Sequence, residues 1–245
     1  MNFAPSLADV LQSAERLILA AIGEDIGTGD ATSLAIISPE QKIKAVIIAK
    51  AEGIVAGLPI VKAVYAKGDR RVIVAPAIND GTRVKPGDVL VTLEGTALPI
   101  LTYERIALNF LQHLSGIATL TAAFVAAVQG TRAVILDTRK TTPGYRVLEK
   151  YAVRIGGAKN HRHGLFDMVL VKDNHIHAAG SISVAVRRAR ECYSSLPLEV
   201  EVTSLEQLKE ALSLPVDMIQ LDNMDLTMIR QSVALVNNRV PLIRG

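Results

Sequence analysis

The spacing of apolar residues divides the chain into an irregular first part and a regular second part. Apolar side chains recur every three to four residues between Leu7 and Ile18, which predicts a helix over 6–21 that Ser6 caps. Short alternating apolar runs then follow, and Gly, Pro and Asn-Asp turns bound them. These runs predict three strands: 43–50, 71–75 and 89–93.

A long apolar stretch, 99–128, predicts helical structure after the strands. Its core from Ile106 to Thr131 contains no charged residue and is long enough to cross a bilayer. Polar side chains such as Asn109, His113 and Thr119 are scattered through it, however, and they would be costly in lipid. We therefore expect a buried helix or a bent pair of helices, and no membrane partner.

After Arg132 the pattern alternates regularly between strands and helices. This alternation predicts a parallel sheet, either open or closed into a barrel. The helices are expected to begin at Pro143, Ser181, Ser204 and Asp225, and Gly156-Gly157 should end the first of them. The expected strands are 133–136, 168–171, 198–202, 218–221 and 240–243. We predict two domains, 1–131 and 132–245.

Ionisable residues follow the predicted strands of the second part at four successive strand ends. Because the carboxyl ends of parallel strands meet at one edge of a sheet or barrel, these side chains are expected to line one pocket. Lys172 follows one of these strands directly, with Asp173 beside it. The other residues are Asp137, Arg139, Lys140, Glu201 and Asp222.

The net charge is only +3, from 27 basic and 24 acidic residues, but the basic residues are concentrated. The window 139–172 holds eight Lys and Arg residues against Glu149 and Asp167. No nucleic-acid-binding signature accompanies this window, so a small polyanion is the expected partner and nucleic acid is not. Three of its cations lie on or just after the predicted helix, and we expect them to form a solvated helix face: Lys150, Arg154 and Lys159.

The remaining charged residues suit two kinds of chemistry. Arginine and lysine side chains bind carboxylates and phosphates, and the carboxylates opposite them suit Mg²⁺ or a developing positive charge. The cationic set contains Arg139, Lys140, His161, Arg162 and Lys172, and the acidic set contains Asp137, Glu201 and Asp222. Four histidines lie between 161 and 177, but without cysteine or a third ligand they do not predict a zinc site.

Cysteine usage and the N-terminus bear on the compartment. The single cysteine, Cys192, has no partner in the chain for an internal disulfide, which favours a reducing cytosol. The first 15 residues lack the basic head and apolar run of a secretory signal. We therefore expect a cytoplasmic protein.

Several ordered motifs together resemble one enzyme family over almost the whole chain. They lie at 24–33, 103–119, 137–144, 156–162, 172–176, 199–202 and 221–223. Among them are Asp137-Thr138-Arg139-Lys140, Asn160-His161-Arg162 and Leu221-Asp222-Asn223. On these motifs the chain resembles the quinolinate phosphoribosyltransferases, which are also called nicotinate-nucleotide pyrophosphorylases (carboxylating).

The resemblance implies a fold, a reaction and an assembly. An N-terminal mixed α/β sandwich would stand beside an open, incomplete α/β barrel. The reaction would join quinolinate to phosphoribosyl pyrophosphate with Mg²⁺, giving nicotinate mononucleotide, pyrophosphate and carbon dioxide. The family resemblance also implies homodimers or higher oligomers with active sites shared between subunits, in which Arg105 enters a neighbour's site.

The resemblance also implies roles for individual residues. Arg105, Arg139, His161 and Arg162 would bind the two carboxylates of quinolinate. Lys140 and Lys172 would bind the phosphate groups or a carboxylate and take part in catalysis. Glu201 and Asp222 would be catalytic as well, by holding ribose hydroxyls or Mg²⁺ and by stabilising an oxocarbenium-like ribose.

The chain departs from the family pattern at its C-terminal end. It stops at Gly245, where the family continues into further strands and a glycine loop that binds the 5-phosphate. The expectation is therefore a barrel that lacks its last strand or strands and binds phosphoribosyl pyrophosphate poorly. Two alternatives stand beside the main interpretation: a paralogous phosphoribosyltransferase for another pyridine or base, and a truncated, non-catalytic member that binds ligand.

Overall fold

The structure of the chain is a computed structural model that describes residues 5–244. It divides into two compact units, with the division between His161 and Arg162. Each unit has its own buried hydrophobic cluster. The two units are therefore described separately.

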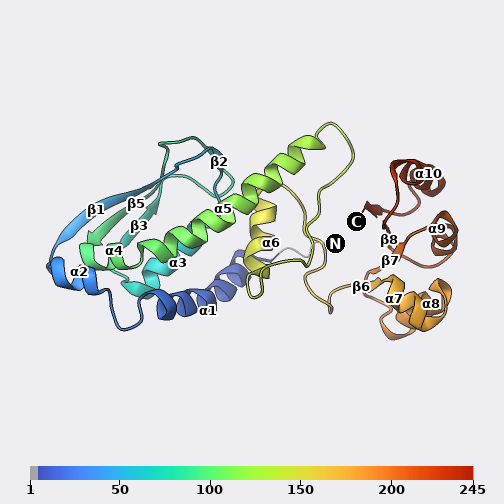
Figure 1. The fold of residues 1–245 in the computed structure, drawn as a ribbon, viewed down its shortest axis with the longest axis horizontal. Helices are drawn as coiled ribbons and strands as arrows, with labels where there is room; N and C mark the ends of the chain where they lie inside the picture. Colours follow the sequence, from blue (N-terminus) through green and yellow to red (C-terminus); the bar gives the residue numbers. More distant parts are fainter. Residues whose placement is uncertain (1–4, 245) are drawn as a thin grey trace. The chain divides into compact units, whose positions relative to one another are not determined.

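The first unit combines an antiparallel sheet with helices (Figure 1). Strands β1, β5 and β3 form the sheet in that order, and β2 pairs with β4. The three predicted strands are confirmed to within a few residues. The elements are α1 (Leu7–Asp25), α2 (Ala31–Ile36), β1 (Lys42–Ile48), β2 (Gly53–Ile54), α3 (Leu58–Gly68), β3 (Ile73–Pro76), β4 (Arg83–Val84), β5 (Val89–Thr96), α4 (Ala97–Thr102), α5 (Glu104–Ala127) and α6 (Arg146–Ile155).

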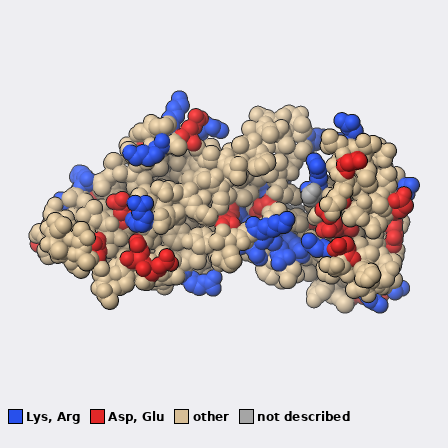
Figure 2. Space-filling model, in the orientation of Figure 1, with Lys and Arg blue, Asp and Glu red and all other residues tan. Residues whose placement is uncertain are grey.

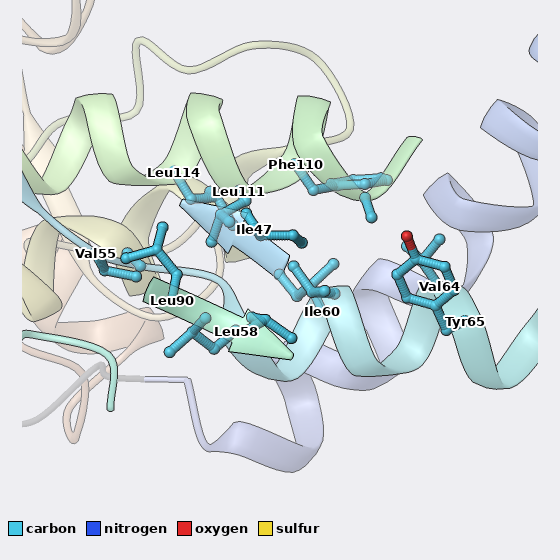
Figure 3. Packing of buried hydrophobic residues seen from close by; sticks show 14 of the residues in the cluster. Ile47, Val55, Leu58, Ile60, Val64, Tyr65, Leu90, Phe110, Leu111 and Leu114 are labelled. Carbon is cyan, nitrogen blue, oxygen red and sulfur yellow. The ribbon is translucent and has the colours of Figure 1, made fainter. Parts of the chain in front are cut away.

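The long helix α5 organises the core of the first unit. It packs against α3, α6 and β2, and its inner side chains Phe110, Leu111 and Leu114 meet residues of α3 such as Ile60 (Figure 3). Removal of these apolar surfaces from water stabilises the unit by about 25 cal/mol per Å². The expected buried helix is therefore buried along one face only, since 28% of its most apolar 18 residues lie inside the structure.

Helix α5 is long and apolar enough to cross a membrane by length and composition alone. Its polar side chains nevertheless serve the fold, because Thr119 Oγ1 accepts the Ile54 N–H at 2.8 Å and Ser115 Oγ accepts the Ala56 N–H at 3.0 Å. Part of its outer face, including Phe124, is exposed. The predicted helical stretch 99–128 is thus two helices, α4 and α5, and the charge-free part is one continuous helix to Ala127.

Two local predictions for the segment after α5 are wrong. Residues 133–136 do not form a strand; only Leu136 makes an isolated parallel bridge, to Lys159. Helix α6 does not begin at Pro143, because Gly144 adopts φ +84° in a turn that Tyr145 N–H closes onto the Thr142 carbonyl at 3.0 Å. A left-handed residue cannot continue a right-handed helix, so the helix begins two residues later.

The second unit is a four-stranded parallel sheet with helices along it (Figure 1). The strand order is β6-β7-β8-β9, and all three pairings are parallel. Every residue of β7 is buried, as expected for a strand that is covered on both faces. The elements are β6 (Val169–Val171), α7 (Asp173–Ala179), α8 (Ile182–Cys192), β7 (Leu198–Val202), α9 (Leu205–Leu212), β8 (Met218–Leu221), α10 (Leu226–Val236) and β9 (Leu242–Arg244).

Helix caps in the second unit agree with the sequence. Ser181, Ser204 and Asp225 each accept an N–H from the first turn of the helix that follows, with distances of 2.8–3.2 Å. The chain thus has a mixed α/β fold, with a sheet-plus-helix unit followed by a parallel-sheet unit, and this confirms the predicted fold class. The domain boundary after Thr131 stays a prediction. In the structure, α6 packs on α1 and α5 within the first compact unit, which extends to His161.

Candidate active site

Apart from Arg105 on α5, the first unit carries its candidate site residues on the loop 137–142 and at His161. Asp137 is the centre of this region: its Oδ1 accepts the Lys150 ammonium at 2.5 Å and the His161 N–H at 2.8 Å. Its Oδ2 accepts the Asn160 side-chain amide at 2.6 Å. These contacts bring the predicted residue His161 next to the start of the loop that carries Arg139.

Helix α6 holds the rest of this loop through its first turns. The Arg146 guanidinium donates to the Arg139 carbonyl at 3.3 Å and to Thr141 Oγ1 at 3.1 Å. Glu149 accepts the Thr142 N–H at 3.3 Å and is itself bound by His113 from α5 at 3.0 Å. The loop is therefore supported along its length by side chains, without regular secondary structure.

The two cations on this loop differ in their surroundings. Arg139 is half-buried, and its Nε is buried with no hydrogen-bond partner among residues 5–244. A buried guanidinium N–H of this kind is costly unless an acceptor reaches it, which suits an anionic ligand. Lys140 is exposed, and its own N–H donates to Thr138 Oγ1 at 3.0 Å. Arg105, near the start of α5, is also exposed.

The second unit brings three predicted residues together at the carboxyl ends of neighbouring strands. Lys172 follows β6, Glu201 lies near the end of β7, and Asp222 follows β8. The Lys172 ammonium lies 3.7 Å from Glu201 Oε2, and Gln220 on β8 reaches the same oxygen at 3.5 Å. Sequence reasoning thus predicted correctly that these strand ends would meet.

Glu201 is the least solvated of these acids, with 9% of its side chain exposed. Burial raises its pKa, and the charges of Asp222 and Asp173 raise it further, while Lys172 opposes the shift. Its negative charge is therefore incompletely compensated in the folded chain. A site of this kind favours a cation or a developing positive charge.

Two further features complete the second unit's contribution. Arg162 is buried, with 7% of its surface exposed. Asn223, directly after Asp222, adopts φ +52° and donates through Nδ2 to Asp222 Oδ2 at 2.8 Å. Asparagine tolerates this left-handed conformation better than most residues, so the turn after β8 can orient the carboxylate.

The histidines were expected in loops or on alternating faces, and two of them lie on α7. His175 Nδ1 accepts the Lys172 N–H at 3.0 Å at the start of that helix. His175 is thus part of a helix cap beside a site residue. Among residues 5–244 no three His, Cys, Asp or Glu side chains form a group that could hold a metal ion by themselves.

Two interpretations of charged residues are corrected by the structure. Lys150 was assigned to a solvated helix face, but its side chain is 1% exposed and paired with Asp137. Asp137 was grouped with the carboxylates available to a metal, but Lys150, Asn160 and His161 already occupy its oxygens. Both errors have one cause: a lysine on a helix is normally solvated, and nothing in the sequence marks this one as buried.

On the face of the molecule that Figure 2 shows, basic side chains gather in groups and are not evenly spread. The sequence analysis assigned no supporting role to the residues that hold this loop: Arg146, Glu149, Lys150 and Asn160. A carboxylate such as Asp137 at the end of an apolar run needs donors nearby, but the sequence does not show which residues supply them.

Comparisons with known proteins agree over almost the whole chain. Residues 30–115 match the family described as "Quinolinate phosphoribosyl transferase, N-terminal domain", and residues 117–244 match its C-terminal domain. A Bacillus subtilis protein named "Probable nicotinate-nucleotide pyrophosphorylase [carboxylating]" is 47% identical over 201 residues, which cover 82% of this chain and 69% of that protein.

Solved structures give the same result. NadC from Streptococcus pyogenes is 41% identical with a TM-score of 0.92, over 96% of this chain and 83% of that one. The nicotinate-nucleotide pyrophosphorylase from Francisella tularensis is 36% identical with a TM-score of 0.95, over 100% of this chain and 86% of that one. Each is a protein to which this chain is similar in both sequence and fold.

Proposed function

The chain belongs to the quinolinate phosphoribosyltransferase family, and we propose how its residues carry out the family's reaction. The enzyme transfers the phosphoribosyl group of phosphoribosyl pyrophosphate to quinolinate, with decarboxylation, in de novo NAD synthesis. The products are nicotinate mononucleotide, pyrophosphate and carbon dioxide. The observation that carries this assignment is the match of both family domains, in order, over residues 30–244.

Quinolinate is a dianion, and its proposed ligands are cationic. Arg139, His161, Arg162 and Arg105 of a neighbouring subunit bind its two carboxylates, because guanidinium groups bind planar carboxylates through paired hydrogen bonds. Arg139 supports this role because it is half-buried and its buried Nε has no hydrogen-bond partner among residues 5–244. Lys140, exposed on the same loop, binds a phosphate or a quinolinate carboxylate.

The ribosyl half of the reaction is assigned to the strand ends of the second unit. Cleavage of the bond between ribose C1 and pyrophosphate leaves positive charge on the ribose. Glu201 and Asp222 stabilise that charge, and Lys172 binds the pyrophosphate or 5-phosphate. The raised pKa of Glu201, caused by burial and by neighbouring acids, supports this role because a nearby cation relieves the same penalty.

The same two carboxylates are the proposed protein ligands of Mg²⁺. Mg²⁺ usually takes one or two carboxylates together with waters and substrate phosphates, so a complete protein cage is not required. When bound, Mg²⁺ neutralises charge on the pyrophosphate group. Glu201 and Asp222 fit this pattern, since the negative charge of Asp222 acts on Glu201.

The enzyme is further proposed to be a soluble, cytoplasmic homodimer or higher oligomer. Exposed Arg105 supports a shared active site, because an exposed cation is available to a neighbouring subunit. The single cysteine, Cys192, is exposed and free, in keeping with a reducing compartment.

Arg139→Ala tests the quinolinate site. The variant should lose about 2–5 kcal/mol of quinolinate binding free energy if a desolvated carboxylate is left unpaired. Isothermal titration calorimetry with quinolinate measures this loss, and an assay of nicotinate mononucleotide formation measures activity. Arg16→Ala removes an exposed arginine from α1 and serves as the matched control. Unchanged quinolinate affinity in Arg139→Ala would reject the assignment.

A further inference from the structure

The first unit contains a buried ion pair that the proposed reaction does not use directly. The side chains of Lys150 and Asp137 are 1% and 6% exposed, and their charged atoms lie 2.5 Å apart. Neither group can reach a ligand without displacing the other. The pair therefore acts through what it holds.

What the pair holds is the backbone of His161. Asp137 Oδ1 accepts the His161 N–H at 2.8 Å, and Lys150 Nζ donates to the His161 carbonyl at 3.1 Å. Both polar backbone groups of one site residue are thus bound by the two members of one ion pair. Asn160 adds a third connection, because its amide donates to Asp137 Oδ2 at 2.6 Å and to the Lys150 carbonyl at 2.9 Å.

The pair also fixes the start of the loop that carries the cations. Asp137 lies two residues before Arg139 and three before Lys140. Arg146 and Glu149, on the same helix as Lys150, bind the loop further along, at the Arg139 carbonyl and the Thr142 N–H. The ion pair thus joins this loop to His161, alongside the backbone bridge between Leu136 and Lys159.

Stability alone does not account for such a pair. Two charges taken out of water lose hydration that their attraction barely restores, so a buried ion pair contributes little net stability compared with an apolar pair. Its distinctive contribution is directional, because each atom of the pair requires a defined partner position. Supporting contacts of this kind keep binding residues within the narrow geometry that ligand recognition needs.

We propose that Lys150 and Asp137 are positioning residues for the quinolinate site, which hold His161 in register with the Arg139–Lys140 loop. This inference rests on the proposed function, because it takes Arg139, Lys140 and His161 to be quinolinate ligands. Asn160 belongs to the same network. The specific consequence is that quinolinate affinity depends on a lysine that does not touch quinolinate.

The test compares two variants of the full chain with the wild type. Lys150→Met keeps an unbranched side chain that is one atom shorter and leaves the Asp137 charge buried and unpaired, so it should lower both the melting temperature and quinolinate affinity. Lys150→Met/Asp137→Asn removes both charges and should regain most of the melting temperature. Quinolinate affinity should stay about ten- to hundredfold weaker in both, the range found for outer-shell partners in metal sites.

The readouts are the quinolinate Kd from calorimetry, the melting temperature, and the separation of KM from kcat. A smaller folded fraction lowers kcat without changing the KM for quinolinate, whereas displacement of the quinolinate ligands raises that KM. Lys159→Met is the matched control, since it removes an exposed lysine from the same segment. It should leave the Kd unchanged.

The outcomes separate this inference from the function on which it rests. A double variant that binds quinolinate with wild-type affinity, or whose affinity recovers in parallel with its melting temperature, would overturn the positioning role alone. A wild-type chain that folds but binds no quinolinate would overturn the proposed function and this inference with it. A folded double variant with a raised Kd supports both.

Discussion

At the scale of single residues, Glu201 is a buried carboxyl group whose ionised form the fold disfavours. Burial, with the charges of Asp222 and Asp173, raises its pKa above the ordinary value of 4.5. Between the ordinary and the raised pKa the folded chain binds more protons than the unfolded chain. By linkage, the Glu201 contribution to stability falls as pH rises through this range.

Glu201→Gln should therefore stabilise the protein while disabling it. At neutral pH the variant should melt a few degrees higher than the wild type, because the uncompensated charge is gone. The gain should disappear below about pH 4, where the wild-type carboxyl is itself protonated. Activity should fall by about a hundredfold or more, because a group aimed at the developing charge is lost. Calorimetric melting over this pH range, with an activity assay, measures both effects.

The control for this prediction is Glu191→Gln. Glu191 is exposed and pairs with Arg187 one turn earlier on α8, at 3.9 Å. Exposed pairs of this kind contribute little, so its melting temperature should hardly change. A Glu201→Gln protein that melts lower than the wild type at neutral pH would show that its hydrogen bonds outweigh its buried charge.

At the scale of secondary-structure elements, two glycines on neighbouring helices are in opposite situations. Gly156 caps α6 where that helix meets α5, and an added Cβ would lie 2.5 Å from the Ala118 carbonyl oxygen and 2.6 Å from Thr121 Cβ. Gly116 lies in the middle of α5, is exposed, and has open space where a Cβ would be. The close contact between α5 and α6 therefore requires glycine at position 156, whereas position 116 has room for a larger side chain.

The two alanine substitutions should consequently change the free energy of unfolding in opposite directions. Gly156→Ala should destabilise by about 1–3 kcal/mol, since the backbone of α5 must move to admit the methyl group. Gly116→Ala should stabilise by about 0.5–1 kcal/mol, because it removes unfolded-state freedom from a helix interior. Urea titrations of both variants give the free energies of unfolding. Equal effects of the two changes would mean that α5 and α6 do not pack as described.

The elements also show where sequence patterns carry enough information. Helices α8, α9 and α10 were predicted within a few residues because a serine or aspartate cap precedes each one. Helix α3 was missed although Pro59 lies in its first turn: Gly57 at its start has φ +109° and no side chain, and Asp80 from another part of the chain binds the Leu58 N–H instead. The segment 133–136 looked like a strand because it is apolar, but strand pairing depends on a distant partner that the local pattern does not reveal.

The residues of the candidate site also divide into those that the sequence predicts and those that it does not. The strand-end residues Lys172, Glu201 and Asp222 were predictable, because topology alone gathers the carboxyl ends of parallel strands. The support for the Arg139 loop was not predictable. Lys150 reaches Asp137 across 13 residues from the buried side of α6, and the sequence contains no marker of that burial.

At the scale of the whole molecule, Arg105 is the proposed link between subunits. It lies near the start of α5, exposed, and far in sequence from the other proposed quinolinate ligands. An arginine placed in a neighbour's site would make each site depend on two chains. Arg105→Ala would then damage the part of a site that the neighbouring chain supplies, and Glu201→Ala would damage the part that the chain itself supplies.

Mixed oligomers of inactive Arg105→Ala and inactive Glu201→Ala subunits should therefore regain activity. In a hybrid dimer one of the two sites receives both defects and the other receives neither, so an intact site forms. With free exchange about half of the dimers are hybrids, and activity should approach about a quarter of the wild-type value, since each has one working site of two. Subunits with two different tags, isolated by successive affinity steps, identify the hybrids and confirm exchange. Hybrids without activity would place Arg105 in its own chain's site or in the fold alone, because every chain in the mixture would then carry a defect within its own site.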